Sequence, residues 1–180
     1  MKGEYNMGDI YTEYMVVKKP NAVDNIKKLG ISIAAILVCA VLFVVSRYVG
    51  VFQPFAIMGG LGALYFGWYL MNNLNVEFEV IVTNGGMDVD KIIARRDRKR
   101  LISVNCANFE ELAKYDPAAA KEQGCTTVIK ACDSEKSDNV YYGIFRHPSK
   151  GKTMVVFNAN EKVLAAMKPY VPRNVWGIKD

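Results

Sequence analysis

The sequence of 180 residues contains a single histidine, His147, and no C-x-x-C pair. Zinc sites and dithiol redox sites need cysteine and histidine at short, fixed spacings. Because these spacings are missing, we expect no metal, no cofactor, and thiols that are reduced and mostly buried. The four cysteines are Cys39, Cys106, Cys125 and Cys132.

Patterns typical of catalysis are also missing. The stretch Gly151–Thr153 (GKT) resembles the end of a phosphate loop, but it lacks the earlier glycine, and a predicted strand follows it. His147 precedes a proline at a strand end, which is typical of a turn. Asp88 and Asp90 share one face of a predicted strand and are interpreted as its solvent side, near basic neighbours. We therefore expect no enzymatic activity.

Charged residues are absent from two long stretches, residues 29–46 and 49–71, of 18 and 23 residues. At ~1.5 Å per residue these give helices of roughly 27 and 34 Å, against about 30 Å of bilayer hydrocarbon. A cleaved signal peptide does not fit, because 28 mostly polar residues precede the first stretch. The sequence predicts a transmembrane helical hairpin over residues 21–72, with Asn21 as the cap of its first helix.

Basic residues predict the orientation of the hairpin, since they are retained on the cytoplasmic side of a membrane. The connection between the two spans contains only Arg47. Both termini are therefore expected in the cytoplasm, with the protein in the cell membrane as a multi-pass protein. The lysines that flank the first span are Lys18, Lys19, Lys27 and Lys28.

Small residues recur every four positions in the second span, at Gly59, Ala63 and Gly67. Such a small-residue ridge lets two helix backbones approach closely in lipid. The expected partner surface is Ala35 and Cys39 of the first span. The pattern leaves open whether the ridge packs within one chain or between the chains of a homo-oligomer.

The predicted cytoplasmic parts are residues 1–20 and a domain of residues 75–180. Residues 10–17 fit a helix or a strand equally well, and both remain open. Residues 76–83 alternate apolar and polar side chains before Asn84 and Gly85, which favour a tight hairpin turn. A second hairpin turn is predicted at residues 96–98.

The second half of this domain is predicted to contain helices and strands. Two short helices are expected, NFEELAKY capped by Asn108 and DPAAAKEQG capped by Asp116. Three strands follow, and a last helix after Asn158 or Asn160 ends before Pro169. Its apolar side is expected to contain Val163, Leu164 and Met167. About six strands in up-and-down order with this helix predict a mainly-β, partly open barrel whose mouth the helix covers.

A basic cluster lies within this domain, at the end of the second predicted hairpin. Residues 91–100 include six cations and one acid, Asp97, and so have a net charge of +5. No aromatic residue lies between Phe78 and Phe109, which disfavours nucleic acid as the partner, because stacking needs aromatics. An anionic lipid surface or an acidic protein remain as partners. The cluster consists of Lys91, Arg95, Arg96, Arg98, Lys99 and Arg100.

Two stretches carry a resemblance to a known family, MGDIYTEYMV near the start and FEVIVTNGGMDVDKIIARRDRKRLISV after the second span. The sequence resembles an uncharacterised family of small bacterial two-transmembrane proteins with a pleckstrin-homology-like cytoplasmic domain. The resemblance implies the fold and the membrane anchoring, and it implies no catalytic residues.

Two functions are expected from these observations. The first is a non-enzymatic integral membrane protein that presents a pleckstrin-homology-like interaction module, with the basic cluster as its binding surface. The alternative is a structural subunit of a membrane assembly that packs through the glycine-rich second span. Glu77, Glu79, Asp88 and Asp90 are expected to neutralise part of the basic cluster.

Overall fold

The computed structural model describes residues 10–116 and 124–178. The chain divides into two compact units. The helical unit consists of residues 19–76, and the β unit combines an N-terminal strand with the residues from 77 onward. The predicted cytoplasmic domain of residues 75–180 therefore also includes a strand that precedes the helices.

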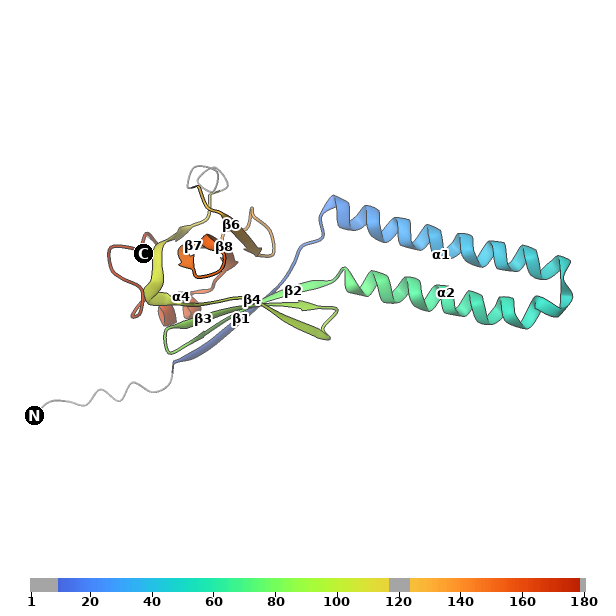
Figure 1. Cartoon of the computed structure of the whole chain (residues 1–180), viewed down its shortest axis with the longest axis horizontal. Helices are drawn as coiled ribbons and strands as arrows, with labels where there is room; N and C mark the ends of the chain where they lie inside the picture. The colour runs from blue at the N-terminus through green and yellow to red at the C-terminus, as the bar shows by residue number, and fades with distance from the viewer. Residues whose placement is uncertain (1–9, 117–123, 179–180) are drawn as a thin grey trace, which may run out of the picture. The chain divides into compact units, whose positions relative to one another are not determined.

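The helical unit contains two long helices, α1 (Ala22–Tyr48) and α2 (Gln53–Asn73), which lie side by side (Figure 1). Asn21 caps α1, and its backbone N–H donates to the Asp24 carboxylate over 3.2 Å, as expected for a capping box. A short 3-10 turn, η1 (Gly50–Phe52), connects the helices. α2 begins at Gln53 because Pro54 is compatible only with the first turn of a helix.

Both helices are apolar around their whole circumference. Their most apolar windows have mean hydropathies of 2.8 and 1.2, and 0% and 6% of these windows is buried inside the structure. Gly67 is the only buried residue of either helix. Core helices of soluble proteins bury their apolar side chains, and these helices do not. Both are long and apolar enough to cross a membrane.

The first sheet of the β unit is fully antiparallel and has the strand order β1-β2-β3-β4. Residues 10–17, for which helix and strand were both open, include strand β1. Its pairing with β2 places Val17 opposite Glu77 and Tyr11 opposite Thr83. The helical hairpin is thus inserted between two neighbouring strands of one sheet. The strands are β1 (Tyr11–Val17), β2 (Val76–Thr83), β3 (Gly86–Ile93) and β4 (Asp97–Asn105).

The two hairpin turns of this sheet differ in how well the sequence predicts them. The predicted turn at Asn84 and Gly85 is confirmed, with φ of 46° and 84°. The second turn lies at residues 94–96 instead of 96–98, closed by a hydrogen bond of 3.0 Å from Arg96 N–H to the Ile93 carbonyl. Its residues Ala94 and Arg95 have φ angles of 53° and 55°, which residues other than glycine rarely adopt. Composition alone gives no signal for such a turn.

The second sheet has the order β5-β7-β8-β6, with β6 parallel to β8 and the other pairs antiparallel. The helix predicted for NFEELAKY is wrong, because these residues form β5. Phe109 and Leu112 are buried against β7, and this packing outweighs the local helical pattern. The helix predicted for DPAAAKEQG falls largely on residues 117–123, outside the described residues. The strands are β5 (Phe109–Lys114), β6 (Thr127–Ala131), β7 (Val140–His147) and β8 (Gly151–Asn158).

The predicted partly open barrel is also wrong, since the strands form two separate four-stranded sheets. A 3-10 turn, η2 (Cys106–Asn108), separates β4 from β5, and the parallel pairing of β6 with β8 replaces an up-and-down order. The C-terminal helix α4 (Glu161–Met167) is confirmed, with Asn160 as its cap. Its side chains Val163 and Met167 are completely buried, and α4 contacts β1.

The packing between β5 and β7 depends on a glycine. The Phe109 ring lies over Gly143 and meets Phe145 edge to face, with ring centroids 5.6 Å apart. A Cβ at Gly143 would lie 2.3 Å from Phe109 Cε1, and Phe109 is only 3% exposed. The ring therefore has no room to move away.

We predict that Gly143→Ala lowers the free energy of unfolding of the β unit by roughly 1–3 kcal/mol through overpacking. Thermal unfolding of the full-length protein in mild detergent, followed by near-UV circular dichroism, measures this. Adding Phe109→Leu to the variant should recover part of the loss, because the smaller side chain leaves space for the methyl group. Strictly additive effects of the two substitutions would contradict this packing.

Candidate functional site: the basic hairpin

The six predicted cations all lie at one end of the β3–β4 hairpin, the basic hairpin. Lys91 belongs to β3, Arg95 and Arg96 to the turn, and the other three to β4. This end of the sheet is also where β1 ends and β2 begins, since β3 runs antiparallel to β2. Both connections to the helical unit therefore leave the β unit at the end that contains the basic hairpin.

The strand register divides the cations between the two faces of the hairpin. Arg100 lies opposite Asp90, and Lys91 lies opposite Lys99. Because successive residues of a strand point to opposite faces, the two lysines share the face opposite to that of Asp90 and Arg100. The basic cluster is thus two separate surfaces.

The arginines pair with acids of β2 and β3. Arg95 Nε lies 2.8 Å from Glu77 Oε1, and Arg98 pairs with Glu79. Arg98 Nε also lies 3.4 Å from Asp90 Oδ2. Arg100 completes the set by binding both Asp88 and Asp90. Together these ion pairs of Arg95, Arg98 and Arg100 form the ion-pair cluster.

Three acids of the ion-pair cluster are buried although they lie on the polar face of the sheet. Asp90 is 1% exposed, Glu79 4% and Glu77 8%. The expectation that Asp88 and Asp90 form the solvent side of the strand is therefore wrong for Asp90. The arginine side chains bind these carboxylates and shield them from water.

Hydrogen bonding stabilises the charged form of two of these arginines. The bond to Asp90 raises the pKa of Arg100 above its usual value, although burial opposes this. The bond to Glu77 likewise raises the pKa of Arg95. Arg95 is exposed, so its pair contributes little to stability, whereas an uncompensated Asp90 would be costly.

The ion-pair cluster removes most of the charge excess. The six cations, Asp97 and the four acids of β2 and β3 together give this end of the sheet a net charge of +1. In the part of the chain that the structure describes, Lys91 and Lys99 have no carboxylate partner. Like charges directly opposite each other destabilise a strand pair.

The small-residue ridge of α2 faces α1 of the same chain. A Cβ at Gly67 would lie 3.2 Å from Ala35 Cβ, and one at Gly59 would lie 3.1 Å from Leu42 Cδ1. The ridge of Gly59, Ala63 and Gly67 thus has a packing partner within the hairpin. The Cys39 thiol, on the predicted partner surface, donates to the Gly60 carbonyl over 3.6 Å.

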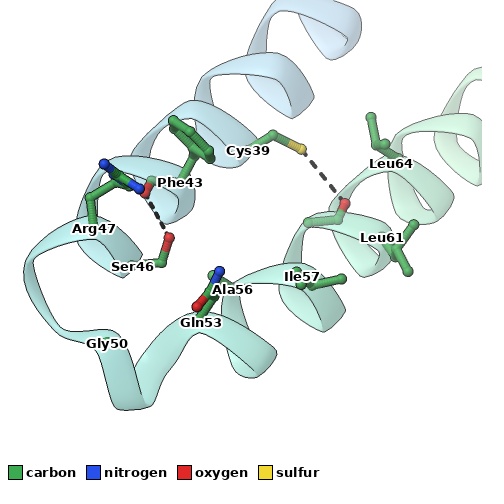
Figure 2. A pocket seen from close by; sticks show the side chains of 11 residues that line it. Cys39, Phe43, Ser46, Arg47, Gly50, Gln53, Ala56, Ile57, Leu61 and Leu64 are labelled. Atoms are coloured by element: carbon green, nitrogen blue, oxygen red, sulfur yellow. Dashed lines mark hydrogen bonds between the residues drawn. The ribbon is translucent and has the colours of Figure 1, made fainter.

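A hollow of about 560 Å³ lies between α1 and α2 near their connection, and sequence reasoning did not find it. Figure 2 shows Cys39 and Phe43 of α1 and Ile57, Leu61 and Leu64 of α2 around it. Ser46, Arg47 and Gln53 line its end beside the connection. The sequence pattern assigns Arg47 only a role in orientation, because no pattern reveals the space between two helices.

His147 and the two buried cysteines have surroundings that explain a structural role. The His147 Nδ1 accepts the Ser149 N–H over 3.2 Å, within the β7–β8 turn. Burial raises the pKa of Cys106 to about 12 and that of Cys132 to about 11, which favours the unreactive thiol form. Within residues 10–116 and 124–178, no group of three or more His, Cys, Asp and Glu side chains is placed to hold a metal ion.

A protein-family model matches most of the chain. The model of a family described as Bacterial PH-like domain (DUF6106) matches residues 8–177, which include both helices and nearly all of the β unit. The comparisons with curated proteins and with solved structures find no match.

We predict that Asp90→Asn lowers the free energy of unfolding by about 2 kcal/mol or more, because it removes the buried carboxylate that Arg100 binds and one of the two that Arg98 binds. Asp88→Asn is the matched control, since it makes the same chemical change on the same strand at a side chain that is 31% exposed. Its effect should stay under about 1 kcal/mol. Thermal unfolding in detergent compares the two variants, and equal losses would contradict the role given to Asp90.

Proposed function

The chain belongs to the bacterial PH-like domain family (DUF6106), and we propose that it is a non-enzymatic integral membrane protein. In this proposal α1 and α2 cross the cell membrane as a hairpin. The PH-like β unit is an interaction module at the cytoplasmic surface. The basic hairpin docks this module on anionic lipid head groups.

The pairing of β1 with β2 is the observation that carries the proposal. Val17 and Glu77 are direct partners, about 5 Å apart, although the whole helical hairpin lies between them in the sequence. Two neighbouring strands of one sheet lie on the same side of any membrane. The number of crossings between them must be even, and two apolar helices satisfy this. The flanking lysines then favour the cytoplasmic side.

Both connections between the helical unit and the β unit are short. Four residues, 18–21, connect β1 to α1, and two residues, 74–75, connect α2 to β2. At ~3.5 Å per residue these reach at most roughly 14 and 7 Å. The basic hairpin lies at the end of the sheet where both connections leave, and this is the end that the proposal docks on lipid.

Anionic lipid fits this arrangement better than an acidic protein does. Lipid head groups are present at the helix ends whenever the helices are inserted, and a Lys or Arg near an anionic leaflet gains ~1 kcal/mol. Lys91 and Lys99, which have no carboxylate partner among the described residues, are the cations proposed for this role. The alternative of assembly through Gly59, Ala63 and Gly67 is not favoured, because that surface packs against α1.

We predict that the protein stays in the membrane fraction after an alkaline carbonate wash and is released only by detergent. A cytoplasm-active reporter fused after Asp180 should be active, and one that is active only outside the cytoplasm should not be. Recovery of the full-length chain in the aqueous fraction would contradict the membrane proposal.

We predict that anionic lipid slows hydrogen exchange in the β3–β4 turn of the full-length protein. Exchange is compared in nanodiscs of phosphatidylcholine and in nanodiscs that also contain phosphatidylglycerol. Reversing Lys91 and Lys99 to Glu should remove the difference in exchange rate between the two lipids, because it removes both cations from the face that they share.

Reversal of Lys136 and Lys162 to Glu is the matched control, since both are exposed lysines outside the basic hairpin. This variant has the same net charge and should keep the wild-type difference. Equal protection of the turn in both nanodiscs, or equal effects of the two double variants, would rule out docking through the basic hairpin.

A further inference from the structure

We propose that the hollow between α1 and α2 is a binding site for an anionic phospholipid of the outer leaflet. The acyl chain occupies the hollow, and Arg47 binds the phosphate. This inference rests on the proposed membrane insertion of the hairpin.

The charge distribution supports this occupant. Arg47 is the only charged residue between Lys28 and Glu77. Its side chain has no hydrogen-bond or ion-pair partner in the part of the chain that the structure describes, and the same holds for Gln53. Both line the end of the hollow beside the helix connection. The planar guanidinium group matches a phosphate in geometry and charge.

The rest of the lining is apolar and needs a cover. Phe43 is 67% exposed, Leu61 64% and Leu64 52%. The volume of about 560 Å³ falls within the range of roughly 300–1,000 Å³ that is typical of small-molecule sites. A polar end and an apolar body along one hollow match an amphiphile, and a bilayer supplies one at this depth (Figure 2).

The other polar groups of the lining already have partners. The Ser46 hydroxyl donates to the Phe43 carbonyl over 2.7 Å, and the Cys39 thiol donates to Gly60. Only the two side chains beside the connection are left to bind a ligand. The head group is therefore placed at that end, with the acyl chain directed toward Leu64.

Native mass spectrometry of the full-length, delipidated protein in detergent tests the proposal. Titration with dioleoylphosphatidylglycerol and with dioleoylphosphatidylcholine gives two apparent affinities. We expect a preference of about fivefold for the anionic lipid. Arg47→Gln should remove this preference, and Arg47→Lys should keep part of it. Because Arg47 is exposed and has no side-chain partner among the described residues, neither substitution should change the helix content measured by circular dichroism.

A second pair of variants tests the hollow without changing its charge. Ala56→Leu places a larger side chain in the lining and should weaken the binding of both lipids. Gly62→Leu is the control, because an added Cβ there meets no atom within 4 Å and Gly62 does not line the hollow. Equal effects of these two variants would overturn the assignment of the acyl chain.

A third comparison separates this site from the basic hairpin. All titrations are repeated with Lys91 and Lys99 reversed to Glu, and the preference that depends on Arg47 should persist. Membrane insertion without any preference that depends on Arg47 overturns this inference alone. Recovery of the protein in the aqueous fraction overturns the membrane proposal as well.

Discussion

The apolar surface of the two helices is the constraint on which the rest of the structure depends. Gly67 is the only residue of α1 and α2 that the structure buries, although both helices consist mostly of large apolar side chains. Soluble proteins rarely expose apolar patches above a few hundred Å², and two uncovered helices far exceed this. The contacts of Gly59 and Gly67 with α1 bury only a narrow strip. A lipid bilayer would cover the rest without a protein partner.

This constraint acts together with the sheet. Because β1 pairs with β2, the hairpin is an insertion between neighbouring strands, and its two ends must lie close together. Both connections are short, so the end of the sheet that contains the basic hairpin is the end tied to the helices. The order of the chain therefore decides that both connections to the helices leave the first sheet from this one end.

The sequence predicts the features that depend on neighbouring residues. The start of α1 at Asn21, the Asn84–Gly85 turn and the capped helix α4 all follow from local chemistry. Apart from the two-residue shift of the second hairpin turn, the errors concern contacts between distant residues. Residues 109–114 have a helical pattern, but Phe109 packs over Gly143, which lies more than thirty positions away. Neither the pairing of β1 with β2 nor the parallel pairing of β6 with β8 can be predicted from the sequence of the strands themselves. For this reason the sequence pattern predicts one barrel where the structure has two sheets.

The candidate site shows the same division between what is local and what is not. All six cations are visible in the sequence, and so are the acids that neutralise them, but the count of charges does not say which cations are paired. The register decides this, because it places Asp90 opposite Arg100 and Lys91 opposite Lys99. The arginines then stabilise buried carboxylates, and two lysines are left on the other face. Arg47 differs from the cluster, because it is a single charge that adds little to any count of charges. It nevertheless lines the hollow described between the helices. The two proposed lipid sites therefore rest on how the charges are paired and not on how densely they occur.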